Sequence, residues 1–269
     1  MLEIFDDIRK IYTFSPPCEE LSEHIEFFSE SSFEATSRHV GKECFTVKMF
    51  PSWTPTFYIN LGEPYYLTLN GNRYFIKAGD DVLILRDSIV ERHNLPADHI
   101  FTIKFFPGGL EAVFGINQTS LINKAVNANR IIPSALIHQM KELSSFEERM
   151  NLVQNFFLSN YNRRKKRGHY IKFVQDSIEM YGAANMQFNN NQLAEKMFTT
   201  SKTINRYFNN IVGTTPKNYF SILRARAALT AYVNNKKLFD PSAYGYYDTS
   251  HFYKDVIKFT GQKLVEHPL

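Results

Sequence analysis

Cysteine is scarce in this chain, and the few cysteines form no recognised motif. Among 269 residues only Cys18 and Cys44 occur, with no CxxC pair and no other spacing typical of metal ligands. A small secreted scaffold needs several disulfides to replace a large core, and two distant cysteines do not supply them. The chain is therefore not a disulfide framework, and we expect it to act in a reducing cytoplasm.

Long apolar runs are missing as well. The longest uncharged stretches are interrupted by Asn, Gln and Pro, so no segment predicts a helix that crosses a membrane. Residues 1–7 are acidic and hold no extended apolar core, which argues against a secretory signal peptide. We expect no membrane partner.

Motifs of catalysis are the third absence. The sequence holds no phosphate loop, no dinucleotide fingerprint and no arrangement of Ser, Cys, His and Asp typical of a nucleophilic enzyme. His39, His93 and His99 could ligate a metal ion only by converging with a carboxylate, but no His-x-His pair occurs. We expect ordinary surface or hydrogen-bonded histidines, and we predict no metal, no cofactor and no catalytic residue.

What the chain does have is an uneven charge distribution. Residues 1–159 carry 14 Lys and Arg against 20 Asp and Glu, a net charge of −6. Residues 160–269 carry 17 against 7, a net charge of +10. A basic half commonly binds a polyanion, although a merely soluble basic domain gives the same numbers. The split favours a nucleic-acid partner for the second half.

The first half of the chain predicts a β-rich domain. Short runs of aromatic and β-branched residues alternate with turn residues over residues 40–107. Asn70-Gly71 separates two of these runs, and both residues tolerate the positive φ of a type I′ hairpin turn. Evenly spaced strands of this kind form small barrels or sandwiches. The runs cover residues 44–49, 56–61, 65–69, 74–77, 81–85 and 100–106.

Helical signals begin after the last of these runs. Ser145 opens a capping box for a helix that is predicted to end near Tyr161. Five consecutive cations follow at residues 163–167, and their mutual repulsion predicts an exposed linker, which either is simply solvated or also touches phosphates. The predicted division is a first domain over residues 1–162, a basic linker over 163–168 and a second domain over 169–269.

Residues 192–208 have the form of a helix-turn-helix. The small Ala194 would let the two helices approach closely, while Ile204 and Phe208 would anchor the second helix in the core. That orientation leaves donor-rich side chains on the outer face, where they can read base edges in a major groove. These side chains are Lys202, Thr203, Asn205, Arg206 and Asn209.

A second motif further along the chain makes this pattern specific. It consists of the run Gly245-Tyr-Tyr-Asp-Thr-Ser-His-Phe-Tyr-Lys254, followed by Phe259-Thr-Gly261. With the long helix predicted to start at Thr215-Pro216, residues ~169–266 closely resemble the AraC/XylS family of bacterial transcription regulators. The resemblance implies seven helices, in which one long helix holds two helix-turn-helix units and both recognition helices enter successive major grooves.

The resemblance also places contacts with DNA residue by residue. Lys202, Asn205 and Arg206 match contact positions of the family's first recognition helix, and residues 249–254 supply the second. Thr200 and Asp248 match the helix caps, and two further lysines could meet phosphates. The predicted DNA-binding residues are Thr200, Lys202, Thr203, Asn205, Arg206, Asn209, Lys217, Thr249, Ser250, Tyr253, Lys254 and Lys258.

One stretch departs from the family pattern. Pro241 lies where the first helix of the second unit is expected, and proline breaks a helix interior. That helix must therefore start at Asp240-Pro241 and be short. Whether the second unit reads bases stays open. His251 could contact DNA or pack beside Tyr247, and the sequence does not decide between the two.

The first half resembles the cupin-like sensor domain that precedes such DNA modules. The resemblance rests on residues 59–66, Gly79-Asp80 and residues 105–110, and covers residues ~15–159. It implies a small β-barrel followed by helices and names no ligand. Its aromatic residues could line a pocket or form the barrel core: Trp53, Phe57, Tyr58, Tyr65, Tyr66, Tyr74 and Phe75.

The sequence thus predicts an α+β protein, with a small cupin-like β-barrel and trailing helices before an all-α domain of two helix-turn-helix units. We expect a sequence-specific transcription regulator that binds double-stranded DNA and is not an enzyme. A small-molecule effector and a homodimer are left open. The competing hypotheses are a cupin-type enzyme with an accessory helical domain and a protein-interaction scaffold. The missing metal ligands argue against the first, and the donor-rich recognition helix argues against the second.

Overall fold

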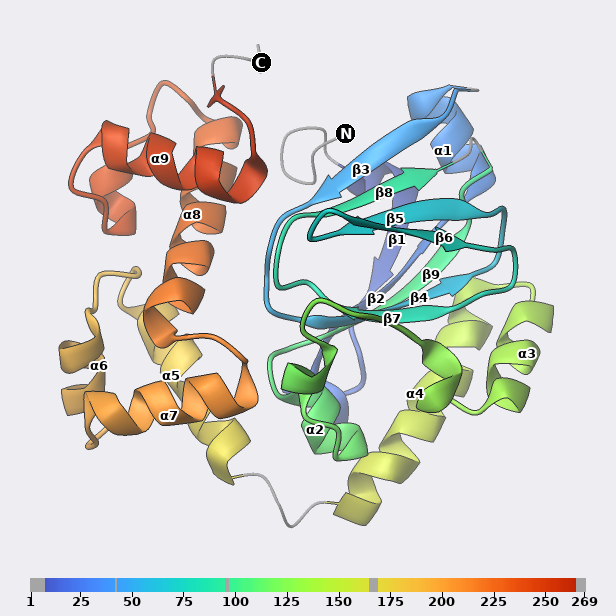
Figure 1. The fold of residues 1–269 in the computed structure, drawn as a ribbon, viewed down its shortest axis with the longest axis horizontal. Helices are drawn as coiled ribbons and strands as arrows, with labels where there is room; N and C mark the ends of the chain where they lie inside the picture. The colour runs from blue at the N-terminus through green and yellow to red at the C-terminus, as the bar shows by residue number, and fades with distance from the viewer. Residues whose placement is uncertain (1–7, 42, 95–96, 165–168, 265–269) are drawn as a thin grey trace.

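The fold is mixed α+β, as the sequence predicts. The computed structural model describes residues 8–41, 43–94, 97–164 and 169–264. Two antiparallel sheets and their covering helices make up the sheet part (residues 8–164), and a cluster of helices makes up the helical part (residues 169–264) (Figure 1). Within these described residues no helix is long and apolar enough to cross a membrane.

The strands of the sheet part form a six-stranded and a four-stranded sheet. Their orders are β1-β2-β9-β4-β7-β10 and β3-β8-β5-β6, and the neighbouring strands pair antiparallel. The strands are β1 (Tyr12–Ser15), β2 (Ile25–Ser31), β3 (Phe45–Met49), β4 (Pro55–Asn60), β5 (Tyr65–Leu69), β6 (Asn72–Ile76), β7 (Val82–Leu85), β8 (Val90–Asn94), β9 (Ile100–Phe105) and β10 (Ala125–Asn127).

The predicted hairpin is confirmed. Asn70 and Gly71 have φ values of 48° and 77°, and they join β5 to β6 with Leu69 opposite Asn72. The six predicted runs all correspond to strands, with ends that differ by up to two residues. Four strands carried too weak a pattern to be predicted: β1, β2, β8 and β10.

Strand β8 was missed because it carries polar residues into the interior. Arg92 and Asn94 are buried between the sheets, so the strand lacks the apolar alternation that marks its neighbours. The Arg92 guanidinium carbon lies 5.7 Å from the ring centres of Tyr58 and Tyr65, and its Nη2 lies 3.2 Å from Oδ2 of Asp98. A cation and its carboxylate can stay charged in an apolar interior when they pair in this way.

Two apolar cores lie on the two faces of the six-stranded sheet. One fills the space between the sheets and includes Tyr58, Tyr65 and Leu67. The other lies under helices and includes Phe57 and Phe157, which are both fully buried. The helices and 3₁₀ turns of the sheet part are η1 (Ile8–Ile11), η2 (Glu19–Leu21), α1 (Phe33–Val40), α2 (Gly109–Phe114), η3 (Gln118–Leu121), η4 (Ala128–Arg130), α3 (Ser134–Glu142) and α4 (Phe146–Arg164).

The burial of the aromatic residues of the first half shows which of them form the core rather than line a pocket. Phe57, Tyr58 and Tyr65 are buried core residues, whereas Tyr66 and Phe75 are exposed and contact each other with ring centres 5.0 Å apart. Tyr74 is half-buried against the core between the sheets. Trp53 is not part of the core between the sheets and instead packs where the sheet part meets the helical part.

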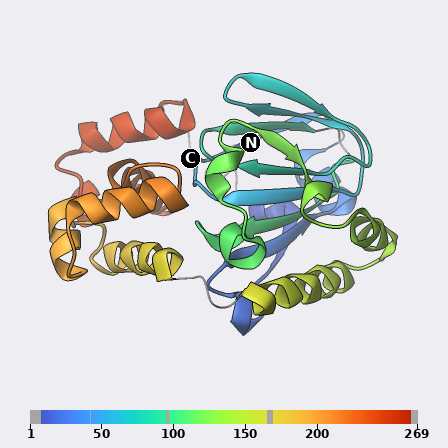
Figure 2. The same ribbon diagram turned by 60° about the horizontal axis from the view of Figure 1, so that its bottom comes forward.

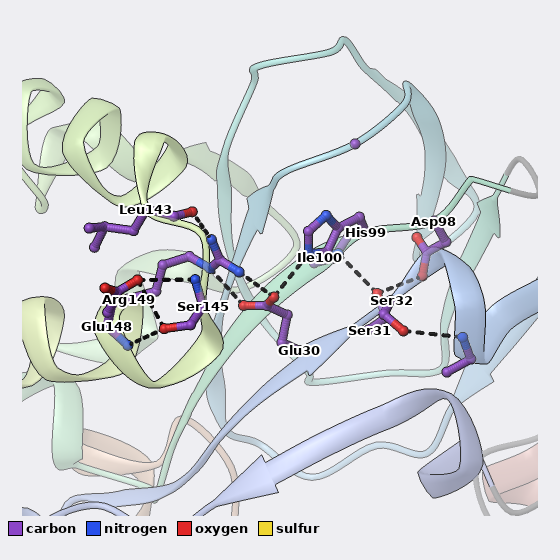
Figure 3. A network of polar contacts seen from close by, with 12 residues as sticks. Glu30, Ser31, Ser32, Asp98, His99, Ile100, Leu143, Ser145, Glu148 and Arg149 are labelled. Carbon is purple, nitrogen blue, oxygen red and sulfur yellow. Dashed lines mark hydrogen bonds and ion pairs between the residues drawn. The ribbon is translucent and has the colours of Figure 1, made fainter.

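A buried ion pair fixes α4 on the six-stranded sheet (Figure 3). Arg149 donates from Nε to Oε2 of Glu30 on β2 at 2.8 Å, and His99 lies 2.9 Å from Oε1 of the same carboxylate. Burial by itself raises the pKa of Glu30, but hydrogen bonds from His99 and Arg149 outweigh it and lower the pKa. The capping box at Ser145 forms as predicted, with Glu148 as its partner.

The helical part consists of five α-helices and one short 3₁₀ turn within its described residues. They are α5 (His169–Ala183), α6 (Asn190–Lys196), α7 (Ser201–Ile211), α8 (Pro216–Asn234), η5 (Pro241–Tyr244) and α9 (Thr249–Thr260). Thr215 caps α8 and Pro216 occupies its first turn, as predicted. The helix before the linker extends three residues beyond the predicted end, to Arg164, so part of the proposed linker is helical. Residues 165–168 lie outside the described residues, and the predicted domain division stays a prediction.

The two parts share side chains, which the sequence did not predict. Phe50, from the loop between β3 and β4, is buried in the core formed by α8 and α9. Trp53 from the same loop packs against three of the four apolar cores. The Gln118 side chain donates to the carbonyl oxygens of Trp53 (3.0 Å) and Val212 (2.8 Å). The sheet part and the helical part therefore share core residues.

Candidate nucleic-acid interface

The first helix-turn-helix consists of α6 and α7, and local hydrogen bonds define both helix starts. The Asn189 side chain accepts from the backbone N–H of Gln192 at 3.0 Å, and the Gln192 side chain accepts from the backbone of Asn189 at 2.9 Å. Thr200 caps α7 by accepting from the N–H of Thr203 at 3.2 Å. Such caps satisfy orphan N–H groups and hold each helix start in place.

The second helix of this unit is strongly two-faced. Ile204 and Phe208 are fully buried, as predicted, and Ala194 lies buried where α6 meets α7. Lys202 and Arg206 are exposed on the opposite face. The core therefore fixes which side chains face outward.

The predicted amide contacts of α7 are folded back on the helix. Asn205 donates from Nδ2 to the carbonyl oxygen of Ser201 at 2.8 Å, and Asn209 donates to the carbonyl oxygen of Asn205 at 2.7 Å. The Thr203 hydroxyl lies 3.0 Å from that of Thr200. Reading a base with any of these groups requires exchanging an intrahelical hydrogen bond for one to DNA.

The second unit starts with a shortened helix. Asp240 caps a 3₁₀ turn of four residues, η5, by accepting from the N–H of Ser242 at 2.9 Å. The prediction of a late and short helix at Asp240-Pro241 is confirmed. Asp248 then caps α9 by accepting from the N–H of His251 at 2.7 Å. Phe252 and Val256 are fully buried under this helix.

A polar cluster joins the second unit to the long helix α8. Arg224 of α8 lies 3.2 Å from Oδ2 of Asp255, which also accepts from the Tyr246 hydroxyl at 3.0 Å. The Arg224 guanidinium carbon lies 4.3 Å from the centre of the Tyr246 ring, and burial raises the pKa of Tyr246. We call these three residues the clasp. Nothing local in the sequence marks it, because its members belong to three separate segments.

The remaining predicted residues of the second unit lie on the surface. Thr249, Ser250 and Lys254 are exposed near the start of α9. Tyr253 is partly exposed beside Tyr232, with ring centres 6.5 Å apart. The predicted phosphate contacts Lys217 and Lys258 are exposed too, on α8 and on the last turn of α9. The His251 ring lies 6.0 Å from that of Tyr246, rather than beside Tyr247 as one alternative had it.

Both recognition helices begin on the same side of the molecule. In Figure 1, α7 and α9 start on the left, far from the sheets, and both run toward the sheet part, with α8 connecting them. In the turned view of Figure 2, α7 and α9 again run toward the sheet part. The starts of the two recognition helices therefore lie on one side of the helical part.

Arg206 lies further along α7, near the sheet part. It lines an open cavity of about 410 Å³ together with Glu111 and Asn117 of the sheet part. Asn117 also donates to the carbonyl oxygen of Asn210 at the end of α7, at 2.8 Å. Burial raises the pKa of the Glu111 carboxyl in this region. The inner end of the first recognition helix is thus tied to the sheet part.

A second cavity, of about 340 Å³, lies between the two parts. Lys104 and Phe106 line it from β9 and the loop after it, while Lys172, Tyr219 and Leu223 line it from the helical part. Among the described residues no group of three or more His, Cys, Asp or Glu side chains could hold a metal ion.

Comparison with known proteins gives structural neighbours only. No family model matches the sequence, and no curated protein matches it. ToxT from Vibrio cholerae is similar with a TM-score of 0.47 and 10% identity, over 83% of this chain and 96% of that one. A ToxT structure with a bound unsaturated fatty acid gives 0.48 and 11%, over 82% and 91%.

One further neighbour is an AraC-like transcriptional activator. This protein, CuxR, is similar with a TM-score of 0.31 and 11% identity, over 84% of this chain and 88% of that one. With TM-scores below 0.5 and identities of 10–11%, these likenesses assign no function to this chain.

Proposed function

We propose that this chain is a sequence-specific DNA-binding transcription regulator of the AraC type. The observation that carries the proposal is the pair of helix-turn-helix units on α8, whose recognition helices begin on one side of the molecule. A rigid pair of this kind can enter successive major grooves on one face of a duplex. The net charge of +10 over residues 160–269 supplies the attraction to phosphate.

The exposed side chains divide into two chemical roles. Arg206 and Asn205 are suited to base edges, because guanidinium and amide groups make paired hydrogen bonds with guanine and adenine. Lys217 and Lys258 are suited to phosphates, where a point charge is enough. The first role gives sequence preference, and the second gives affinity that depends on salt.

The experiment is a selection of bound sequences from random duplex DNA at two stated salt concentrations. We expect one recurring sequence in two blocks, with an affinity that falls steeply as salt rises. Recovery of unrelated sequences, or no binding at low salt, would contradict the proposal and favour a protein-interaction scaffold.

Single variants then test the assigned roles. Arg206→Ala should lower the affinity for the selected duplex by about 1–3 kcal/mol and relax the preference at one base pair. Lys217→Ala should weaken binding to all duplexes alike and flatten the salt dependence. Arg130→Ala, which removes an exposed arginine from the sheet part, is the matched control and should change neither.

We also propose that the cavity of about 340 Å³ between the two parts is where a small-molecule effector acts. Its lining comes from both parts, so a ligand there would favour one arrangement of them over another. The lining combines apolar walls such as Phe106 and Leu223 with two ion pairs. These pairs are Lys104–Glu26 and Lys172–Glu23, each with nitrogen and oxygen 2.9 Å apart. An amphipathic ligand could therefore exchange its polar end with one of these pairs.

A thermal-shift screen of small molecules tests this role, with Leu223→Trp as the control in which the new side chain fills the cavity. We expect at least one ligand that raises the melting temperature of the wild type and not that of Leu223→Trp. Failure to find such a ligand would contradict the proposal.

A homodimer on repeated sites remains our proposal for assembly. Each recognition helix contacts few base pairs, and a dimer would multiply that modest affinity. The sheet part is the expected place for the dimer contact. Mass measurement free and on DNA tests the proposal, and a monomer at every concentration would contradict it.

A further inference from the structure

Two aromatic side chains stand out on the surface of the described residues. Phe198 is 97% exposed and Tyr247 is 94% exposed, more than any other large apolar side chain there. Phe198 lies two residues before Thr200, the N-cap of α7, and Tyr247 directly precedes Asp248, the N-cap of α9. Each unit thus carries one exposed ring in the turn before its recognition helix, although the two rings differ by one residue in their distance from the N-cap.

Folding gives no reason for Phe198. Its φ of 51° lies in the left-handed region, which suits Gly or Asn and is unfavourable for a bulky side chain. Polar groups hold the turn without the ring. The N–H of Phe198 donates to the carbonyl oxygen of Glu195 at 3.1 Å, that of Thr199 donates to the carbonyl oxygen of Ala194 at 2.9 Å, and the Ser201 hydroxyl donates to Oδ1 of Asn191 at 2.6 Å. The ring contributes no burial to the free protein, and glycine would form this turn at lower free energy.

Tyr247 is equally unexplained by packing. Its neighbour Tyr246 is buried and belongs to the clasp, so Tyr246 is the aromatic side chain that packs this turn onto the core. Gly245 supplies the left-handed residue of the turn, with a φ of 73°. The Tyr247 side chain is exposed to water.

The surroundings indicate what these rings can meet. Lys196 and Lys202 are exposed on either side of Phe198 in the sequence, and Ser250 and Lys254 follow Tyr247. A partner for such a surface is a polyanion that also offers apolar patches. Duplex DNA offers two of these at the groove edge, the deoxyribose and the thymine 5-methyl group.

We propose that Phe198 and Tyr247 are DNA contacts that pack against deoxyribose or a thymine methyl group, one ring in each of the two grooves. This rests on the proposed function. Phe198 has no polar side-chain atom, so its contact has to be apolar, whereas the Tyr247 hydroxyl can in addition donate to a phosphate. The strain at Phe198 and the exposure of both rings are then costs in the free protein that binding offsets.

The experiment compares variants of the full chain on the selected duplex. Phe198→Gly and Tyr247→Ser should each weaken binding about tenfold, because each removes the partial burial of one aromatic side chain against an apolar group. Phe198→Gly should also melt at the same or a higher temperature, because it removes the strained φ. Phe198→Asn, which tolerates a positive φ, should give the same loss of affinity. Phe75→Ser removes an exposed ring from β6 and is the matched control.

The duplex itself separates the two apolar partners. Replacing thymine by deoxyuridine should weaken wild-type binding to the level of Phe198→Gly if the ring meets a methyl group, and should leave it unchanged if the ring meets deoxyribose. Either outcome supports the inference when the variants lose affinity. Variants that bind as tightly as the wild type, or no more weakly than Phe75→Ser, overturn it while the proposed function stands. A wild-type chain that binds no duplex overturns both.

Discussion

The two helix-turn-helix units reach the same geometry by different means. The first has a regular seven-residue helix, α6, which buries Leu193 and Ala194 against α7. The second replaces this helix by the four-residue turn η5, none of whose residues is buried. Both recognition helices nevertheless start at a side-chain cap and bury the residues four and eight positions after it, which are Ile204 and Phe208 in the first unit and Phe252 and Val256 in the second.

The difference shows what a recognition helix requires. In the second unit the clasp of Arg224, Asp255 and Tyr246 adds a polar connection to the apolar core that α9 shares with α8. Phe50 adds an aromatic contact from the sheet part, with its ring centre 5.8 Å from that of Phe259. We therefore expect the first unit to depend on its core and the second on polar groups and on the sheet part.

The largest effect is expected from emptying the core of the first unit. Phe208→Ala should lower the free energy of unfolding by about 3–5 kcal/mol, because the ring is fully buried. Phe208→Leu keeps part of the volume and should cost less. Urea unfolding followed by circular dichroism measures both. A loss below about 1 kcal/mol for Phe208→Ala would show that the first unit does not depend on this core.

The next largest effect is expected at Gly245, which precedes α9 and lies against the backbone of Met186, between α5 and α6. A Cβ on Gly245 would lie 2.8 Å from the carbonyl oxygen of Met186, and its φ is 73°. Gly245→Ala should therefore cost about 1–3 kcal/mol. Gly182→Ala is the matched control, since a Cβ there meets nothing within 4 Å in helix α5, and it should stabilise by about 0.5–1 kcal/mol. Equal effects of the two substitutions would contradict the close contact.

The clasp can be broken with a single isosteric change. Asp255→Asn removes the charge that Arg224 and Tyr246 share and should cost about 1–2 kcal/mol, because the group is only partly exposed. Asp176→Asn breaks the exposed pair with Lys172 and should cost under about 0.5 kcal/mol. Thermal melting of the two variants measures the contrast. If they melt alike, the second unit is not held by the clasp.

The smallest effect should be the same in both units. Thr200→Ala and Asp248→Ala each remove an N-cap and should cost about 1 kcal/mol. Thr200→Ser and Asp248→Asn keep a capping oxygen and should be close to neutral. A large cost in one unit and none in the other would mean that the caps, like the first helices, serve the two units differently.

Local features of this fold could be predicted from the sequence. The caps at Thr200 and Asp248 and the hairpin at Asn70-Gly71 depend on a few neighbouring residues, and the structure confirms them. The short helix before Gly245 followed from the geometry of proline alone. Such features need no knowledge of what lies across the molecule.

Features that join distant segments could not be predicted. The clasp unites residues of α8, α9 and the turn before α9, and Gln118 joins η3 to the end of α7. Strand β8 escaped notice because its inward positions hold Arg92 and Asn94, whose partners come from other strands. The same limit applies to α7: its outward face could be predicted from the sequence, but its contact with the sheet part through Asn117 could not.

The central claim is that the two units read one face of a duplex together. Hydroxyl-radical footprinting of the full chain on its selected site tests this most directly. We expect two protected segments whose centres lie about one helical turn, ~10 base pairs, apart on the same face. One protected segment, two segments on opposite faces, or no protection at all would contradict it.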